Sequence, residues 1–219
     1  MKRQLLAVLL VLGGVLLGAV GMARADLMRI GTATYDADGS GPGVGIGGVN
    51  LIYDSDLKLT WLDYTNAPKR WSDQVNWAQG LGSVLTVTLD TRYQLMAGDW
   101  GSGWRLPVWV SPSNSELGTL KQELADPLNA GVFQRLITSS VGPYYGWYWS
   151  GTTDVNNSMM AWAFDLSDGE QFLKYTGCRS YGVAVHEGVV APVPEPATLL
   201  LFGAGLAGLA TVRRKRDRR

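Results

Sequence analysis

The chain has 219 residues, with 19 Lys and Arg residues against 19 Asp and Glu residues, a single histidine and a single cysteine. One cysteine excludes an intramolecular disulfide and argues against a cysteine-rich metal site. The charges are unevenly distributed, because segment 26–191 holds 10 basic and 17 acidic residues, a net charge of −7. Nucleic-acid binding needs a clustered positive surface, so we expect no nucleic-acid partner.

The first 25 residues have the three parts of a secretory signal peptide. Lys2 and Arg3 precede an apolar run over residues 5–20, and Ala23-Arg24-Ala25 follows. We therefore expect residues 1–25 to be removed and residues 26–191 to form one exported domain. The alternative is an uncleaved membrane-anchoring helix, but the apolar run is short for a stable span.

The first half of the exported body predicts strands and then a helix. Strands are expected over 28–35, 51–53 and 58–63, with a glycine-rich loop over 36–48 and an acidic turn between the second and third strands. Within residues 70–82, Trp71, Val75 and Ala78 recur at helical spacing. We expect Ser72 to cap this helix and Gly80 or Gly82 to end it.

A second helix is predicted before Pro127, where Ser113 and Glu116 have the spacing of a capping box and three leucines line one face. Strands should follow within 145–152, 160–175 and 181–188, with a hairpin turn at Asp168-Gly169. Trp162, Phe164 and Leu166 should share one strand face. The order of strands, two helices and then antiparallel strands predicts a compact single domain of the α+β class.

Residues 192–219 form a tripartite tail with the sequence "VPEPATLLLFGAGLAGLATVRRKRDRR" from Val193 onward. Pro194, Glu195 and Pro196 come first, residues 197–212 carry no charge, and residues 213–219 are basic. As a helix the uncharged segment would span about 24 Å, slightly less than a hydrocarbon core of about 30 Å. The basic end should remain cytoplasmic, with the body outside. A plain membrane anchor would explain everything here except the Pro-Glu-Pro.

This tail resembles the PEP-CTERM sorting signal of Gram-negative bacteria, with 194–196 as its motif. The resemblance implies recognition in the inner membrane by an exosortase and association with exopolysaccharide production and biofilms. We therefore expect export through the inner membrane by the secretion machinery and transient anchoring by the C-terminal helix. The processed protein should then reach the cell surface or the extracellular matrix.

The stretches "GWRLP" and "YWSGT" are the most specific parts of a pattern that covers roughly residues 52–188. In this pattern the body resembles the DUF1566 family, represented by the C-terminal domain of the Legionella collagen-like adhesin. The resemblance implies a C-type-lectin-like or sulfatase-modifying-factor-like fold and no established activity. Trp104, Arg105, Leu106 and Pro107 match the most regular stretch, whereas His186 replaces an arginine usual in the family. We expect Arg105 to bind backbone carbonyls or a carboxylate rather than a ligand.

No set of residues predicts catalysis, so we expect neither an enzyme nor a catalytic residue. Cys178 and His186 could form a nucleophile and base, but a buried thiol and a strand-end imidazole explain them better.

Calcium is a weak possibility as a cofactor, and no other cofactor is expected. The candidate ligands are Asp36 and Asp38 in one acidic turn and Asp54 and Asp56 in another. Neither turn completes an EF-hand, so solvated turns are favoured.

Aromatic residues are the strongest candidates for ligand contact. Trp147 and Trp149 should point to one side of a strand and Tyr148 to the other, so one set should fill the core and the other could face a sugar. The alternative, which is favoured, is that these aromatic residues serve the core alone. The sequence therefore predicts a secreted surface or matrix protein with a binding or structural role and extracellular polysaccharide as a partner. A polysaccharide-modifying or hydrolytic enzyme and an inert spacer remain the alternatives.

Overall fold

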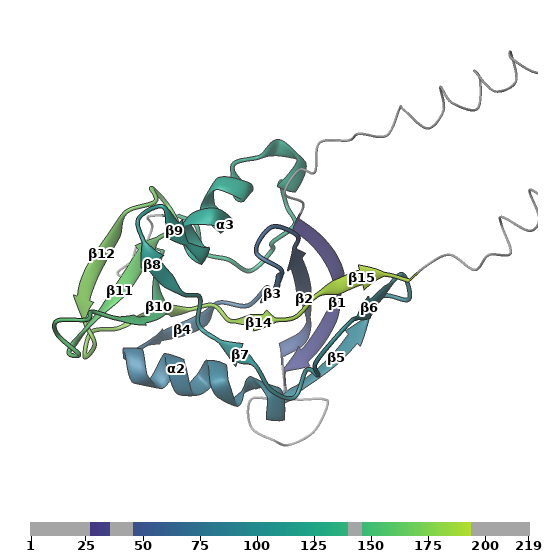
Figure 1. The fold of residues 1–219 in the computed structure, drawn as a ribbon, viewed down its shortest axis with the longest axis horizontal. Helices are drawn as coiled ribbons and strands as arrows, with labels where there is room; N and C mark the ends of the chain where they lie inside the picture. The colour runs from purple at the N-terminus through teal and green to yellow at the C-terminus, as the bar shows by residue number, and fades with distance from the viewer. Residues whose placement is uncertain (1–26, 36–45, 140–145, 194–219) are drawn as a thin grey trace, which may run out of the picture.

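A computed structural model describes residues 27–35, 46–139 and 146–193 (Figure 1). The expected signal peptide, the acidic turn with Asp36 and Asp38, and the sorting motif at Pro194, Glu195 and Pro196 lie outside these ranges.

A six-stranded sheet forms the centre of the fold. Its strand order is β5-β1-β2-β3-β14-β7, and every neighbouring pair is antiparallel. Both faces of this sheet are buried, since Leu51 and Ile52 are adjacent in β2 and are both 0 % exposed. The strands are β1 (Leu27–Tyr35), β2 (Ile46–Asp54), β3 (Leu59–Leu62), β5 (Leu85–Leu89), β7 (Trp104–Arg105) and β14 (Val185–Glu187).

A second sheet of five strands has the order β12-β11-β10-β13-β4. The β11–β12 hairpin turns at the predicted Asp168-Gly169, where Gly169 has a φ of +92°. Two strand pairs, β15–β6 and β8–β9, complete the β-structure of the described residues. The remaining strands are β4 (Asn66–Lys69), β6 (Tyr93–Leu95), β8 (Trp109–Ser111), β9 (Asn114–Ser115), β10 (Trp147–Thr153), β11 (Met160–Asp165), β12 (Gln171–Tyr175), β13 (Ser180–Gly182) and β15 (Val190–Pro192).

The described residues include two α-helices, α2 (Trp71–Gly80) and α3 (Glu116–Leu124), which lie on opposite sides of the folded body (Figure 1). Both predicted helices are confirmed, but both predicted caps are wrong. Arg70 precedes α2 in the N-cap position with no side-chain cap, so Ser72 already lies inside the helix. Ser115, not Ser113, caps α3, because its hydroxyl accepts the backbone N–H of Gly118. Two short 3-10 helices, η1 (Leu81–Ser83) and η2 (Pro127–Asn129), follow α2 and α3.

The apolar interior consists of two clusters, one on the side of each helix. Ala78 of α2 belongs to the first cluster, with Ile30, Leu51 and Trp149. Leu117 and Leu120 of α3 belong to the second cluster, whose further members include Ile52, Trp61, Tyr148 and Phe164. Each cluster draws residues from both large sheets, so the alternation of side chains along the strands distributes them between two cores.

The predicted α+β class is wrong, because strands make up 44 % of the structure and helices only 17 %. The sheets are curled and the fold is mainly β. Strands of two or three residues, such as β7, β9 and β14, are too short to show a period of two in the sequence. The two helices, in contrast, are long enough to show the helical period in the sequence. A fold class predicted from sequence periods therefore overestimates the helical part. The structure does not support the expected lectin-like fold.

Candidate functional site

Arg105, at the end of β7, is the centre of a charged network that joins β7, α3 and β14. Its Nη1 and Nη2 atoms donate to the two carboxylate oxygens of Glu116 at 2.7 and 2.8 Å, and its Nε donates to Glu187 at 2.9 Å. Nη1 also donates to the carbonyl of Leu106 at 3.1 Å. The guanidinium therefore binds two carboxylates and a backbone carbonyl, which is the arrangement expected for a structural arginine.

Burial and ion pairing shift the pKa of Arg105 in opposite directions. The Arg105 side chain is 25 % exposed and that of Glu116 is 17 % exposed. Burial alone lowers the pKa of Arg105, but the hydrogen bonds and charges of Glu116 and Glu187 outweigh it and raise the pKa. Arg105 therefore stays charged, and its donors are used within the protein.

The other members of the "WRLP" stretch are buried around this arginine. Trp104 and Leu106 are each 2 % exposed, and the indole N–H of Trp104 donates to the carbonyl of Trp100. Pro107 is buried, and its carbonyl accepts the backbone N–H of Gly151 at 2.7 Å. None of these three side chains presents a surface to a ligand.

His186 and Cys178 lie in different environments. His186 is 2 % exposed, packs against Trp100 and Trp104, and places its Nε2 atom 2.8 Å from the carbonyl oxygen of Asp99. Burial lowers the pKa of His186, so the ring is neutral at pH 7. Cys178 is exposed in the turn after β12, which contradicts the expected buried thiol. A buried ring and an exposed thiol do not make an accessible nucleophile and base.

Asp54, one of the candidate calcium ligands, is completely buried and holds the turn between β2 and β3. Its Oδ1 accepts the backbone N–H groups of Asp56 and Leu57, and its Oδ2 accepts the indole N–H of Trp61. Asp56 is exposed. Within the part of the chain that the structure describes, no three His, Cys, Asp or Glu side chains are arranged to hold a metal ion.

Glu123, near the end of α3, is a buried acid that the sequence analysis missed. Its side chain lies beside Asp54, is 7 % exposed, and neither carboxylate oxygen accepts a hydrogen bond. Burial, and then the charge of Asp54, raise the pKa of Glu123 to about 8. The side chain is therefore protonated at pH 7 and can donate to the Asp54 carboxylate.

The aromatic candidates on β10 lie mainly inside the fold. Tyr148 and Trp149 are both 0 % exposed and belong to opposite core clusters, as the predicted alternation requires. The Tyr148 hydroxyl lies 2.7 Å from the Thr65 hydroxyl, and burial raises the pKa of Tyr148 to about 12. Trp147 is partly exposed, with its edge on Phe172 and the Lys174 ammonium 4.4 Å from its ring centroid. Trp147 is thus the one member of the set with accessible surface.

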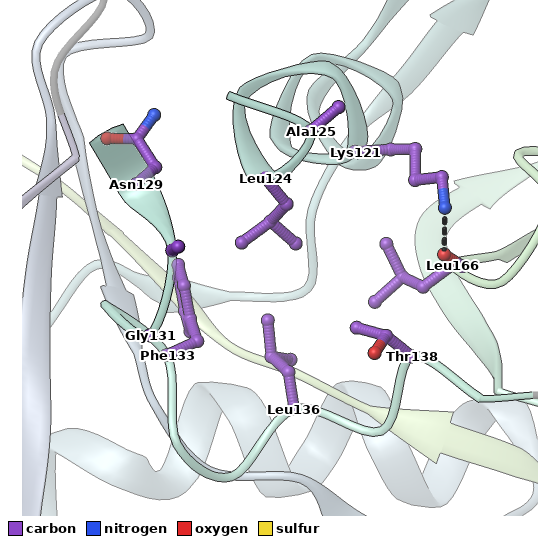
Figure 2. Close-up of a pocket in the computed structure, with 10 residues that line it drawn as sticks. Lys121, Leu124, Ala125, Asn129, Gly131, Phe133, Leu136, Thr138 and Leu166 are labelled. Carbon is purple, nitrogen blue, oxygen red and sulfur yellow. Dashed lines mark hydrogen bonds between the residues drawn. The ribbon is translucent and has the colours of Figure 1, made fainter. Parts of the chain in front are cut away.

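A half-open pocket of about 320 Å³ lies beside α3 and is bordered by the chain that follows this helix (Figure 2). Figure 2 shows Leu124, Leu136 and Leu166 pointing toward one another across this space, with Lys121 at its edge. The Lys121 ammonium donates to the carbonyls of Leu166 and Ser167 at 2.7 and 2.8 Å. The amide of Asn129, another lining residue, donates to the carbonyl of Glu123. These donors stabilise the fold rather than serve a ligand.

A groove of about 250 Å³ lies by the start of α3 and the β11–β12 hairpin, and Lys121 borders it as well. Its lining is mainly uncharged and polar, with hydroxyl or amide groups from five side chains: Ser113, Ser115, Thr119, Gln122 and Gln171. The amide of Gln171 accepts the indole N–H of Trp109 at 2.6 Å and donates to the carbonyl of Pro112. Gln171 therefore connects the groove to Trp109 through a hydrogen bond.

Trp109 stacks on Trp162 of β11, with ring centroids 3.5 Å apart and an angle of 13° between the planes. Both indoles are partly exposed. The period of two places Trp162 on the face of Phe164, but no sequence pattern indicates Trp109, because the two tryptophans are 53 positions apart and meet only through folding. A polar groove beside a stacked aromatic pair is the best candidate site in the described structure.

Comparison with known proteins identifies the tail. The family model of the PEP-CTERM protein-sorting motif matches residues 192–216. The chain is therefore an exosortase-targeted, secreted surface protein that is held by its C-terminal region before processing. No curated protein and no solved structure matches the chain. The resemblance of the body to DUF1566 remains a hypothesis.

The membrane-spanning segment expected over 197–212 lies outside the residues described. Across 27–35, 46–139 and 146–193, no helix is long and apolar enough to cross a membrane.

Proposed function

We propose that the exported body is a non-enzymatic binding module for a neutral extracellular polysaccharide, delivered to the cell surface or matrix by the sorting signal. The observation that carries this proposal is the groove lined by Ser, Thr and Gln side chains next to the stacked Trp109 and Trp162. Hydroxyl and amide groups exchange hydrogen bonds with sugar hydroxyls, and indole rings bind the apolar faces of sugars.

The charges around the groove favour a neutral polymer. Among the described residues that line the groove, Lys121 alone is charged, and its ammonium already donates to two backbone carbonyls. The body as a whole has a net charge of −7, which repels polyanions. A neutral polysaccharide needs no free cation in the groove and is not repelled by the acidic body.

The test is binding of the processed protein, purified from its host, to the neutral polysaccharide fraction of that host's matrix. Calorimetry should give a saturable affinity, and analysis of the polymer should show no change in chain length or substitution. The variant Thr119→Ala/Gln122→Ala removes two polar groups from the groove and should weaken binding about tenfold, as expected for the loss of one or two hydrogen bonds.

The matched control is Ser72→Ala/Gln79→Ala, which removes the same kinds of group from the exposed surface of α2. It should bind like the wild type. Equal affinity of the wild type and the groove variant would contradict the proposed site. Turnover of the polymer would instead favour the enzymatic alternative, and absence of both binding and turnover would favour an inert spacer.

A further inference from the structure

The sorting signal begins inside the folded domain. The matched region starts at residue 192, and Pro192 is the last residue of β15, where it lies opposite Tyr93 of β6. The next residue, Val193, still donates its backbone N–H to the carbonyl of Arg92 at 2.7 Å. Pro194, the first residue of the motif, therefore follows directly on a residue that is bonded to the domain.

The pairing of β15 with β6 keeps the chain in this position up to Val193. The backbone N–H of Met96 donates to Val189 and that of Val193 donates to Arg92, which defines the hydrogen-bonded pairs of the ladder. Pro192 falls between such pairs, at a position that needs no N–H donor, so the proline is compatible with the strand.

The attachment of β15 to the rest of the fold is weak. β15 and β6 form a separate two-stranded sheet of three residue pairs at one side of the molecule (Figure 1). Val190, 5 % exposed, anchors β15 in the first core cluster, whereas Pro192 and Val193 are exposed. A short ladder with one buried side chain is the kind of element that opens locally while the domain stays folded.

An enzyme that processes a polypeptide binds the backbone on both sides of its target in an extended and unpaired form. Here the residues just before Pro194 are paired with β6. We propose that β15 must separate from β6 before an exosortase can process the chain, so that this strand pair controls access to the sorting motif.

A disulfide between β15 and β6 tests this proposal. Ala191 and Gln94 lie directly opposite each other, and both side chains have accessible surface. The variant Ala191→Cys/Gln94→Cys carries Cys178→Ser in addition, so that only the new pair can form a disulfide. In an exosortase-bearing host, intact mass measurement should show at least about tenfold less processed protein than in the wild type, because processing follows the open population.

The matched control is Ala191→Ser/Gln94→Ser with Cys178→Ser, which cannot be locked and should be processed like the wild type. Six Gly and Ser residues inserted after Val193 should restore processing of the locked variant, because they place the motif away from β15. A locked variant processed at the wild-type rate, or one that the insertion does not rescue, overturns the proposal.

Val190→Ala tests the proposal by weakening the β15–β6 pair instead of locking it. It removes most of the buried anchor of β15, so processing should become several-fold faster while the rest of the body resists added protease. An unchanged or slower rate contradicts the proposal. A wild type that is itself not processed would contradict sorting by an exosortase, and not specifically the role of β15.

Discussion

Two glutamates at opposite ends of α3 have opposite electrostatic environments. Glu116, in the first turn, accepts two hydrogen bonds from Arg105 and a third, at 2.6 Å, from the backbone N–H of Val108. Glu123, in the last turn, is buried without a hydrogen-bond donor and lies beside Asp54. The first is an acid paired with a cation in a satisfied network, and the second is an acid kept protonated by its surroundings.

This difference shows how α3 is attached to the β-structure. Its N-terminal end is fixed to β7 through Arg105, whose raised pKa keeps the guanidinium charged. Its C-terminal end rests against the β2–β3 turn through a carboxyl pair that holds only while Glu123 keeps its proton. The two ends should therefore respond differently to mutation and to pH.

The largest effect is expected from Arg105→Met, which leaves Glu116 partly buried without its cation. Breaking such a pair from one side costs about 3–5 kcal/mol of unfolding free energy. Urea unfolding at pH 7 measures it. The control is Arg92→Met, which breaks an ion pair whose arginine is 71 % exposed and should leave stability unchanged within error. Equal losses in the two variants would show that Arg105 is no more than a surface charge.

Glu123→Gln should remove a pH dependence that the wild type shows. The folded-state pKa of Glu123 is about 8, above its ordinary value of 4.5, so the folded protein binds the extra proton. Wild-type stability from this group is therefore complete below pH 4.5 and is lost as the pH rises to about 8. Near pH 8 the glutamine variant should be more stable by a few kcal/mol, because one pKa unit corresponds to about 1.4 kcal/mol.

Thermal unfolding of both proteins between pH 5 and pH 9 measures this difference. The gap between the two curves should widen with rising pH. Parallel curves would mean that Glu123 is ionised in the folded protein, and the contrast with Glu116 would be lost.

Asp54→Asn separates the two causes of the raised pKa of Glu123. Removing the neighbouring charge should lower this pKa, but burial is the larger cause and should keep it above 4.5. The carboxyl resonance of Glu123, followed by NMR during a pH titration, reports the change. Asp56→Asn should lower the pKa less, since Asp56 is the smallest of the contributing causes. A larger effect of Asp56 would contradict the packing described for the turn.

The smallest effect concerns the N-terminal cap of α3. Ser115→Ala should cost about 1 kcal/mol because the hydroxyl accepts the Gly118 N–H. Ser113→Ala should cost much less, since Ser113 is exposed and lies outside the helix. Denaturant unfolding of the two variants distinguishes them. The reverse order would restore the cap predicted from the sequence.

Helical spacing and turn chemistry were sufficient to predict part of this fold. Leu117 and Leu120 recur at helical spacing and are buried as expected, and Gly169 forms the predicted hairpin turn. The capping box was placed two residues early because Ser113 and Ser115 both precede the helix and both have a suitable side chain. Only the backbone geometry decides which of them is the cap.

The charged network, the Glu123–Asp54 pair and the fold class depend on contacts between residues that are distant in the sequence. Arg105 was correctly expected to bind a carboxylate, but its partners Glu116 and Glu187 are 11 and 82 positions away. Glu123 and Asp54 are both ordinary acidic residues in the sequence, and their proximity comes from the packing of α3 against the β2–β3 turn. The mainly β class was missed for a similar reason, since two- and three-residue strands are defined by their partners rather than by their own pattern.

Replacement of Pro194, Glu195 and Pro196 by alanine tests whether an exosortase sorts this protein. Wild type and variant are expressed in an exosortase-bearing, polysaccharide-producing host, and intact mass and fractionation show where each protein goes. The wild type alone should lose its tail and reach the matrix. If both proteins stay full length in the membrane, the tail is only an anchor and the sorting function is contradicted.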